Sequence, residues 1–360
     1  MNTTGNLDLI KKMNRSLVLE TVRSHQPISR AALSRKLGLS RSTISSIVDE
    51  LLSKKFVIEL GLGDSTKEGG RRGMELGFNP MSAFGLGLDI GDNRILHIVT
   101  DLNGEIVFEK ECPATSNIKQ MINNIHNFIR ESGIEQHLLL GIGIAVPSIV
   151  NGNKEVVVDA PALGWKDINL KEEMKAHFPF PVFVNNDVNC AALGERWVGQ
   201  GAQTNDMFFI SIGTGVGSAI IANGGLVQGH QFSAGEIGYF LDKEDIEEKD
   251  INQFGGFGIF ERKISELIGC MHHSREASSQ LTLYLSLVLS NVVSLLNPER
   301  VIIGGPMALS LSPIIEEIRN RVALLSPLKT NIELACLDDR ASALGAVSYV
   351  FEQIQENIII

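Results

Sequence analysis

Apolar residues near the start of the chain recur with the three- to four-residue period of an amphipathic helix, in three successive segments. Ser29 and Ser40 precede the second and third segments, where a side-chain oxygen can cap a helix N-terminus. Gly38 follows the second segment and supplies the left-handed residue that often ends a helix. The pattern therefore predicts three helices, over 14–24, 29–38 and 40–55.

The third predicted helix combines an apolar face with a polar leading end. Its apolar residues have the spacing of a helix packed on one side: Ile44, Ile47, Val48, Leu51 and Leu52. Its first turns carry short or forked hydrogen-bonding side chains: Arg41, Ser42, Thr43, Ser45 and Ser46. Two short helices joined by a Gly-Leu-Ser turn are typical of a helix-turn-helix. In that motif the positive N-terminal end of the second helix meets phosphates and base edges in the major groove.

Two β-type runs, over 56–60 and 74–78, flank a glycine-rich connection after the third helix. The tip of this connection reads EGGRRG and carries Arg71 and Arg72, which suit a narrow minor groove or the DNA backbone. A helical protein-interaction or dimerisation module with a charged hairpin is the alternative. The order of the helices, the polar reading face and the arginine-bearing hairpin together favour a winged helix-turn-helix that binds DNA.

From residue 79 on, β-type runs alternate with helical segments, which indicates α/β layers with mainly parallel or mixed sheets. Each half of this region opens with a strand, a glycine turn and another strand, first at FGLGLDIGDNRI and again at MFFISIGTGVGSAII. A helix over 118–132 and the buried strand LLLGIGIAVP follow the first opening, and a helix over 281–296 and the strand VIIGG follow the second. The repetition predicts a duplicated, two-lobed fold with a ligand site between its lobes.

Charge is distributed unevenly along the chain. Residues 1–80 carry 13 Lys and Arg against 8 Asp and Glu, a net charge of +5, whereas the other 280 residues sum to −15. A basic module on an acidic body is typical of a nucleic-acid-binding protein. The four cysteines form no CxxC pair, the N-terminus lacks the apolar core of a signal peptide, and the apolar run 281–296 is too short to span a bilayer. We therefore expect a cytoplasmic protein without membrane partners.

Seven segments together resemble the ROK family, which joins bacterial sugar kinases to sugar-responsive repressors. They are DIG at Asp89, GIAVPSIV at Gly143, APALGWKDINL at Ala160, NNDVNCAALGE at Asn185, IGTGVG at Ile212, GEIGY at Gly235 and VIIGG at Val301. The resemblance implies a two-lobed, actin-like (ribonuclease-H-like) body. The winged helix ending in GGRRG resembles the repressor branch, of the xylose-repressor type. The expected domains are 1–78, 79–190 and 191–360, with the terminal helix able to pack back on the first lobe.

The resemblance also implies a sugar site. Asp187 follows the β-type run PVFVNN, so it would lie at the carboxyl end of a strand, and it matches the family's catalytic Asp. Asn186, Glu236 and Glu261 match further sugar contacts, and their amide and carboxylate groups suit adjacent hydroxyls. Read from the residue alone, Asp187 could instead be a turn residue or a helix cap. Trp165 could offer an aromatic face to a sugar ring or pack as an ordinary exposed Trp.

The phosphate side departs from the kinase pattern. The family's kinases usually have Asp-Ile-Gly-Gly-Thr in the first strand-turn-strand, and here Asp92 and Asn93 replace the last two residues. The charge and bulk of Asp92 would oppose close approach of a phosphate. The second glycine loop is intact, at Gly213, Thr214, Gly215 and Gly217. It could bind residual nucleotide, or it could be a tight turn that needs positive φ. We expect loss of phosphotransfer, so Asp187 would be a vestigial base.

Many members of the family hold a structural zinc with one His and three Cys beside the sugar. The four corresponding positions here are Tyr239, Asn252, Phe254 and Ile259, which lack the thiolates that zinc requires. We therefore expect no zinc and no other cofactor. Tyr239 could replace the sugar contact of the family's His or narrow the pocket toward a smaller sugar.

These observations predict a dimeric or higher oligomeric repressor that binds double-stranded operator DNA and responds to a small sugar. Xylose is favoured by the resemblance alone, and glucose, an amino sugar or a phosphorylated sugar are alternatives. The rival hypothesis is an active ATP-dependent sugar kinase with an attached DNA-binding domain. A third is a regulator controlled only by a protein partner.

Overall fold

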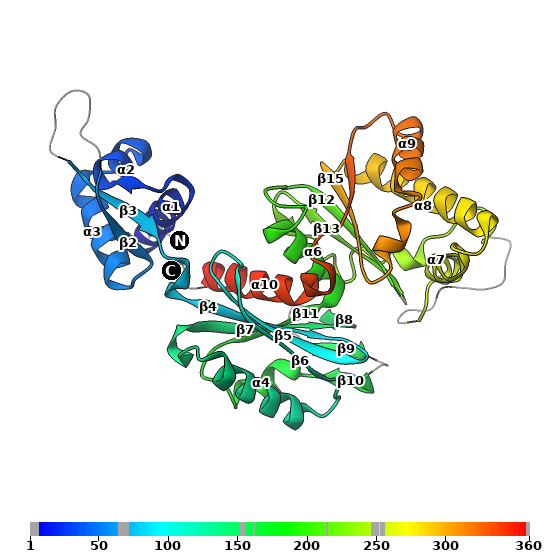
Figure 1. Cartoon of the computed structure of the whole chain (residues 1–360), viewed down its shortest axis with the longest axis horizontal. Coiled ribbons are helices and arrows are strands. Elements are labelled where there is room, and N and C mark those ends of the chain that lie inside the picture. The colour runs from blue at the N-terminus through cyan, green and yellow to red at the C-terminus, as the bar shows by residue number, and fades with distance from the viewer. Residues whose placement is uncertain are drawn as a thin grey trace, which may run out of the picture.

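The computed structural model of the chain describes residues 7–63, 72–151, 156–160, 163–213, 215–245, 252 and 256–357. A small N-terminal unit lies at one end of the molecule, followed by two α/β lobes with the terminal helix between their sheets (Figure 1). This arrangement is the predicted winged helix followed by a two-lobed body.

Three helices and a three-stranded sheet in the order β1-β3-β2 form the N-terminal unit. Its elements are α1 (Leu7–His25), β1 (Ile28–Ser29), α2 (Arg30–Leu37), α3 (Arg41–Ser53), β2 (Val57–Leu62) and β3 (Met74–Phe78). Both predicted serine caps are present: Ser29 Oγ accepts from the Ala32 amide at 3.3 Å, and Ser40 Oγ accepts from the Thr43 amide at 3.1 Å. Gly38 ends α2 in the left-handed region, at φ 67°. The second and third predicted helices are therefore confirmed.

The first helix differs from its prediction. It begins at Leu7 instead of residue 14, and Leu17 is 47% exposed, whereas Val18 and Val22 are fully buried. The early turns of α1 do carry apolar residues, but Ile10 and Met13 are 50% and 59% exposed, so they form no buried face that would extend the predicted helix. Strand β1 was not predicted either, because a strand of two residues leaves no alternating pattern.

A five-stranded sheet in the order β11-β7-β4-β5-β6 forms the centre of the first lobe. Its strands are β4 (Phe84–Ile90), β5 (Arg94–Asp101), β6 (Ile106–Pro113), β7 (Leu139–Val146) and β11 (Val182–Asn186). Strands β4, β7 and β11 are parallel, so their carboxyl ends meet at one edge of the sheet. Helices α4 (Ile118–Ser132) and α5 (Leu170–Lys175) supply side chains to the apolar core on one face.

Helix α10 (Ala341–Asn357) covers the opposite face of this sheet. Glycines alternate along β4 and β7 and make that face flat. A Cβ added to Gly87 would collide with the Ala343 carbonyl oxygen, and one added to Gly143 with the Ala346 carbonyl oxygen. Glycine in a strand permits this close approach of another backbone. The terminal helix thus packs back on the first lobe, as the sequence allowed (Figure 1).

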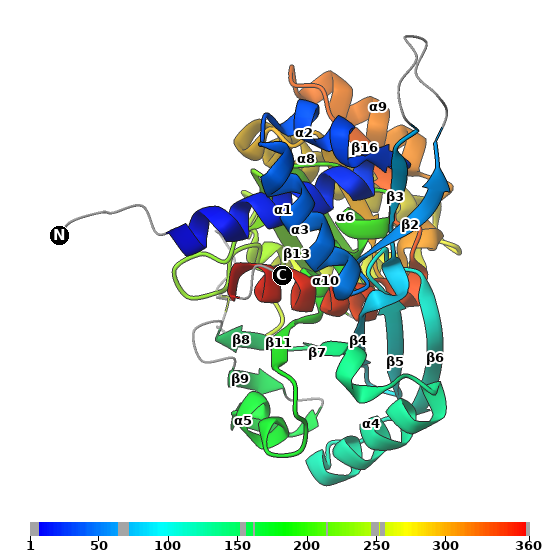
Figure 2. The ribbon, with the colours of Figure 1, turned by 90° about the vertical axis from the view of Figure 1, so that its left-hand side faces the viewer.

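A small antiparallel sheet extends the first lobe and was not predicted (Figure 2). Its strands are β8 (Ile149–Asn151), β9 (Val156–Ala160) and β10 (Trp165–Ile168). Trp165 is only 5% exposed, and its indole N–H donates to the Ser116 carbonyl at 2.9 Å. The expectation that Trp165 is exposed, or that it offers an open face to a sugar, is therefore wrong.

The second lobe is built on a sheet in the order β14-β13-β12-β15-β16. Its strands are β12 (Met207–Ile212), β13 (Val216–Ala222), β14 (Gly225–Leu226), β15 (Arg300–Gly304) and β16 (Asn331–Leu334). Helices α7 (Ile259–Cys270), α8 (Arg275–Leu296) and α9 (Ile315–Leu325) pack in one apolar core with it. Helix α6 (Asp187–Val198) contacts β13 and also crosses α10, where Gly194 and Gly345 allow the backbones to touch.

Helix α8 is longer than the predicted 281–296, because it begins six residues earlier, at Arg275, where Ser274 caps it through the Ala277 amide. With 22 residues it is the one helix, among those described, that is long and apolar enough to cross a membrane by length and composition. The expectation that this segment is too short is therefore wrong. Half of its most apolar stretch is buried inside the protein, and its buried residues belong to the core of the second lobe.

Candidate functional site

The leading end of α3 presents the predicted DNA-reading side chains. Arg41, Ser42 and Ser46 are exposed, and Thr43 and Ser45 are half-buried. The hydroxyls of Ser42 and Thr43 each lie 2.8 Å from Ser40 Oγ, which orders the first turn of the helix. The structure therefore brings all five predicted residues together at the positive end of one helix.

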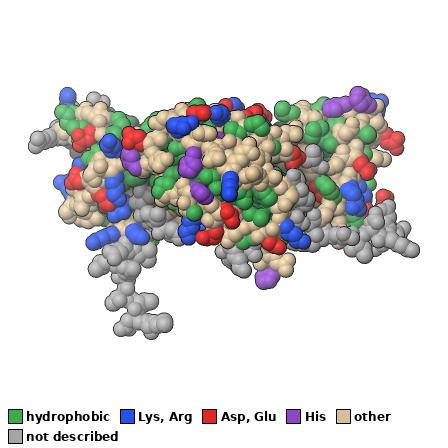
Figure 3. All heavy atoms as spheres, turned by 90° about the horizontal axis from the view of Figure 1, so that it is seen from below, with side chains coloured by type: hydrophobic (Ala, Val, Ile, Leu, Met, Phe, Trp, Pro, Cys, Tyr) green, Lys and Arg blue, Asp and Glu red, His purple; other side chains and the backbone are tan. Residues whose placement is uncertain are grey.

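The wing is the hairpin formed by β2 and β3, and one of its two predicted arginines lies within the described residues. Arg72 is exposed two residues before β3, whereas Arg71 lies outside the described residues. Lys and Arg side chains are visible at the end of the molecule that holds this unit (Figure 3). Arg30, which the sequence analysis did not single out, pairs with Asp49 at 2.7 Å and so links the start of α2 to α3.

Two carboxylates lie at the carboxyl edge of the first sheet. Asp187 begins α6 directly after β11, as predicted, and Asp89 lies near the end of β4, two strands away. Burial, helped by the negative charge of Asp89 and less by that of Asp92, raises the pKa of Asp187 to about 7. Burial also raises the pKa of Asp89 to about 6, against the opposing charge of Arg94. Desolvated, mutually repelling carboxylates are typical of a ligand-binding site.

Asn186 holds the start of α6 in place. Its Oδ1 accepts from the Asn189 amide at 3.0 Å, so Asn186, not Asp187, is the helix cap. Its Nδ2 lies 3.1 Å from both the Ser148 carbonyl oxygen and Asp187 Oδ1. The cap role that the sequence left open for Asp187 thus belongs to its neighbour, and Asn186 also orients the Asp187 carboxylate.

Glu261 connects the second lobe to this edge. Its Oε1 accepts from the Val216 amide at 3.0 Å, and its Oε2 accepts from the Gly258 amide at 3.0 Å. Val216 precedes Gly217, whose added Cβ would lie 2.9 Å from Val188 Cγ2 in the first turn of α6. Glu261 is therefore a brace between α7 and β13, a role that the sequence analysis did not anticipate.

Glu236 completes the arc of predicted sugar residues. It immediately precedes the short 3-10 helix η4 (Ile237–Tyr239), and its residue surface is open to solvent. Partial burial of its carboxyl and, less, the charge of Glu261 raise the pKa of Glu236. The two lobes thus bring the predicted residues near one another. Asp89 and Asp187 interact at the edge of the first sheet, Val188 lies beside Gly217 of the second lobe, and the charge of Glu261 reaches Glu236.

The second glycine loop, over 213–217, requires glycine for a different reason from the one predicted. Gly213, Gly215 and Gly217 are described, Thr214 is not, and none of these three glycines has positive φ. The loop needs glycine for close approach instead: a Cβ on Gly215 would collide with the Glu261 carboxylate. The interpretation as a positive-φ turn is therefore wrong for the described part of the loop.

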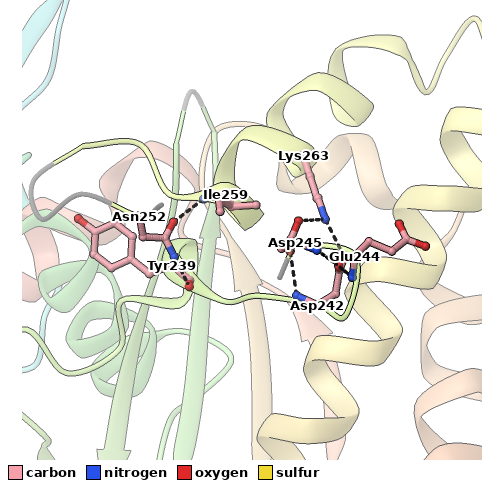
Figure 4. Close-up of polar contacts among 7 residues, drawn as sticks. All are labelled: Tyr239, Asp242, Glu244, Asp245, Asn252, Ile259 and Lys263. Carbon is pink, nitrogen blue, oxygen red and sulfur yellow. Dashed lines mark hydrogen bonds and ion pairs between the residues drawn. The ribbon is translucent and has the colours of Figure 1, made fainter. Parts of the chain in front are cut away.

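Three of the four positions that match family zinc ligands are described, and they form a hydrogen-bonded bridge (Figure 4). Asn252 Oδ1 accepts from the Ile259 amide at 2.9 Å, and Asn252 Nδ2 donates to the Tyr239 carbonyl at 2.7 Å. Phe254 lies outside the described residues. An aliphatic side chain and an amide engaged on both sides do not suit zinc. Across the described part of the chain, no group of three or more His, Cys, Asp or Glu could hold a metal ion.

Sequence reasoning missed Asp89 as a site residue, together with Ser148. A signal was available for Asp89, because it ends a β-type run as Asp187 does, and carboxyl ends of parallel strands share an edge. No sequence signal marks the Ser148 carbonyl, since any residue supplies that group.

Comparisons with known proteins agree with this architecture. Residues 85–265 match the sequence profile described as "ROK family", and residues 14–58 match that of a winged helix-turn-helix DNA-binding domain. The xylose repressor of Bacillus spizizenii is 31% identical over 95% of this chain and 96% of its own length.

Two solved structures share the fold. A ROK family transcriptional regulator, a homologue of the E. coli MLC protein, superposes with a TM-score of 0.78 at 21% identity over 97% of this chain and 98% of its own. The ROK hexokinase from Thermus thermophilus superposes with a TM-score of 0.65 at 20% identity over 76% of this chain and 99% of its own. With a family profile matching half of its length and a relative above 30% identity along almost all of it, this chain belongs to the ROK family.

Proposed function

We propose that this protein is a sugar-responsive transcriptional repressor that binds operator DNA through its winged helix. One observation carries the proposal: the same chain joins an exposed polar reading end on α3 to a body with desolvated carboxylates at a sheet edge. The first feature suits base edges and phosphates, and the second suits a small polyhydroxylated ligand.

Xylose is the proposed effector, because several relatives are named xylose repressors. The proposed sugar contacts are Asn186, Asp187, Glu236, Tyr239 and Glu261, and Glu261 also holds the glycine loop through the Val216 amide. Carboxylate and amide groups bind paired hydroxyls. Because the pKa of Asp187 is raised to about 7, part of the protein carries a protonated Asp187 near neutral pH, and that carboxyl group can donate a hydrogen bond to a sugar oxygen.

Helix α6 offers a physical route between the two functions. Asp187 begins the helix, and Val198 ends it beside Gly104, where an added Cβ would lie 2.6 Å from Val198 Cγ1. Gly104 belongs to the turn between β5 and β6, and Leu102 of the same turn packs against the winged-helix core. A ligand that tilts α6 would therefore move the turn on which the winged helix rests, which suits a bistable coupling element.

The proposed repressor acts as a homodimer or higher homo-oligomer in the cytoplasm, where its operator is. Two winged helices would read a two-fold operator, and sugar binding would change their spacing and weaken DNA binding. By linkage, operator DNA must weaken sugar binding by the same factor. We expect neither zinc nor another cofactor to take part.

An active kinase is the competing function, and the retained Asp187 favours it. Asp92 opposes it, because its exposed carboxylate lies in the first phosphate turn and its negative charge reaches Asp187. A coupled ADP-release assay with hexoses and pentoses separates the two functions. Sugar-dependent turnover that Asp187→Asn abolishes would establish a kinase, and no turnover is expected.

Operator binding measured against increasing D-xylose tests the proposal. We expect protein bound to the operator to dissociate as xylose is added, and the Asp187→Asn variant to stay bound. Arg41→Ala should weaken operator binding roughly tenfold and lower its salt dependence, since one cationic contact is lost. Operator affinity that does not change with xylose or any other simple sugar would refute the effector part of the proposal.

A further inference from the structure

The segment that carries zinc ligands in many relatives is held here by hydrogen bonds and ion pairs that converge on the first turns of α7. We propose that this α7 clasp, formed by Asn252, Glu261 and Lys263, positions Glu236 and Tyr239 for effector binding without a metal. The inference rests on the proposed sugar site for its functional part. Its structural part depends only on the contacts themselves.

Asn252 is the centre of the α7 clasp, since its amide group joins two segments (Figure 4). The oxygen accepts from the Ile259 amide at 2.9 Å, and the nitrogen donates to the Tyr239 carbonyl at 2.7 Å. An amide has a donor on one side and an acceptor on the other, so it can link a carbonyl to an N–H. The bridge joins two of the positions that match zinc ligands in the family, while Asn252 itself stands at a third.

Glu261 fixes the same helix end from the opposite side. Its two carboxylate oxygens each lie 3.0 Å from a backbone nitrogen, one in Val216 and one in Gly258. The second bond caps α7, and the first ties the helix to β13. Charge-assisted bonds of this kind are stronger than neutral ones. The N-terminus of α7 is thus attached to the second sheet as well as to η4.

Lys263, two residues after Glu261 on α7, holds the segment that follows η4. Its Nζ lies 2.7 Å from Asp242 Oδ2 and 2.5 Å from Asp245 Oδ1, and the Asp245 side chain is only 2% exposed. Asp242 and Asp245 in turn accept amide hydrogen bonds within their own turn, which gives the turn a defined shape (Figure 4). A nearly buried ion pair with these added bonds specifies one conformation.

The α7 clasp holds the backbone of Tyr239, and the phenol ring points away from Asn252 (Figure 4). The Tyr239 amide also donates to the Glu236 carbonyl at 3.2 Å, so the two proposed sugar residues move together through η4. Releasing Asn252 would therefore release both side chains at once. Partners of this kind, which orient ligand-contacting groups, commonly change affinity without touching the ligand.

Two substitutions separate the two bonds of Asn252. Asn252→Ala removes both, whereas Asn252→Asp keeps the acceptor for Ile259 and replaces the donor to Tyr239 by a repelling oxygen. Asn123→Ala, on the exposed surface of α4, is the matched control. Hydrogen exchange of the full-length protein reports the Ile259 amide, and thermal-shift titration with D-xylose reports the site. Each measurement is repeated with EDTA, and bound zinc is determined by elemental analysis.

We expect Asn252→Ala to speed exchange of the Ile259 amide by about tenfold or more and Asn252→Asp to leave it protected. Both should weaken xylose binding roughly tenfold at an unchanged sugar-free operator affinity, while Asn123→Ala changes neither. EDTA should have no effect. Stoichiometric zinc, sensitivity to EDTA, or unchanged exchange in Asn252→Ala would overturn the α7 clasp.

A separate result would refute the claim that the α7 clasp positions Glu236 and Tyr239 for effector binding. That result is an unchanged xylose affinity in both Asn252 variants while Asn123→Ala also binds xylose normally. If xylose fails to stabilise the unsubstituted protein, the proposed effector is wrong. The metal-free clasp is then decided by exchange and zinc content alone.

Discussion

Arg23 of α1 donates a hydrogen bond from Nη2 to the backbone carbonyl of Leu102, at 3.3 Å, and so ties the winged helix to the turn between β5 and β6. The guanidinium group also lies over the Phe78 ring, 5.5 Å from its centroid. The Leu102 amide donates in turn to the Pro80 carbonyl at 3.1 Å. One short turn therefore contacts the winged helix through the Leu102 carbonyl and side chain, and contacts the connection that follows β3 through the Leu102 amide.

Replacing Arg23 by Ala should weaken communication between sugar and DNA. We expect the operator affinity without sugar to stay within a factor of about two and the loss of affinity at saturating xylose to shrink roughly fivefold, because coupling elements of this kind contribute modest energies. Fluorescence anisotropy with labelled operator DNA measures both. Arg130→Ala, on the far α4 surface, should leave the response intact. A full xylose response in Arg23→Ala would show that the signal travels by another contact.

The local elements of this fold could be predicted because their causes are local. Ser29, Ser40 and Gly38 cap α2 and α3 within a few residues of sequence. The spacing of the apolar residues of α3 alone indicates which face of that helix is buried. An Asn-Gly pair is a local signal for a tight hairpin turn, and the structure has such turns at Asn103-Gly104 and Asn223-Gly224, with Gly104 at φ 87° and Gly224 at φ 77°.

The site was harder, because its contacts join segments far apart in sequence. The sugar-contact prediction for Glu261 stays a prediction, but its hydrogen bonds to the Val216 and Gly258 amides were not foreseen, because no pattern along the chain marks a backbone amide as a partner. The pairing of Asp89 with Asp187 depends on strand order, which the two β-type runs alone do not fix. Asn252 bonds to the backbone of Tyr239 and Ile259, and no residue type marks such backbone partners, so this bridge could not be predicted from the sequence either.

The glycine face under α10 gives a matched pair of stability predictions. Gly143→Ala should lower the free energy of unfolding by about 2–4 kcal/mol, since the new methyl group would collide with the Ala346 carbonyl in a packed interior. Gly269→Ala in α7 meets nothing within 4 Å and should stabilise by up to about 1 kcal/mol. Urea unfolding measures both. Equal effects of the two substitutions would contradict the close packing of α10 on β7.

Asp187→Asn should separate stability from function. The pKa of Asp187 is raised to about 7, so the folded protein holds a proton that the unfolded chain releases near pH 4. This contribution to stability is present at acid pH and is lost as the pH rises through about 7. At pH 8 the neutral amide should therefore raise the melting temperature by roughly 2–5 °C, and the gain should vanish toward pH 4. Differential scanning fluorimetry across this pH range measures the difference. A variant that is less stable at pH 8 would show that the ionised carboxylate is well solvated or paired.

His97 provides a prediction of the opposite sign in the first lobe. It is fully buried on β5 with its ring 5.3 Å from that of Phe128, and neither ring nitrogen has a well-aligned hydrogen-bond partner among the described residues. Burial lowers the pKa of His97 to about 4, despite nearby backbone groups of Ile95 and Lys110 that raise it. His97 therefore binds a proton near pH 6.5 in the unfolded chain, whereas in the folded protein it stays neutral until about pH 4. The free energy of unfolding consequently falls as the pH drops from about 6.5 toward 4.

His97→Leu should remove this acid sensitivity. Because Asp89 and Asp187 change stability in the opposite direction over the same pH range, the useful quantity is the difference between variant and unsubstituted protein. We expect that difference in unfolding free energy to grow in favour of His97→Leu by roughly 2–3 kcal/mol between pH 7 and pH 4. Urea unfolding at several pH values measures it. A difference that stays constant with pH would mean that His97 becomes protonated within the folded protein at its ordinary pKa, and it would contradict the lowering of that pKa by burial.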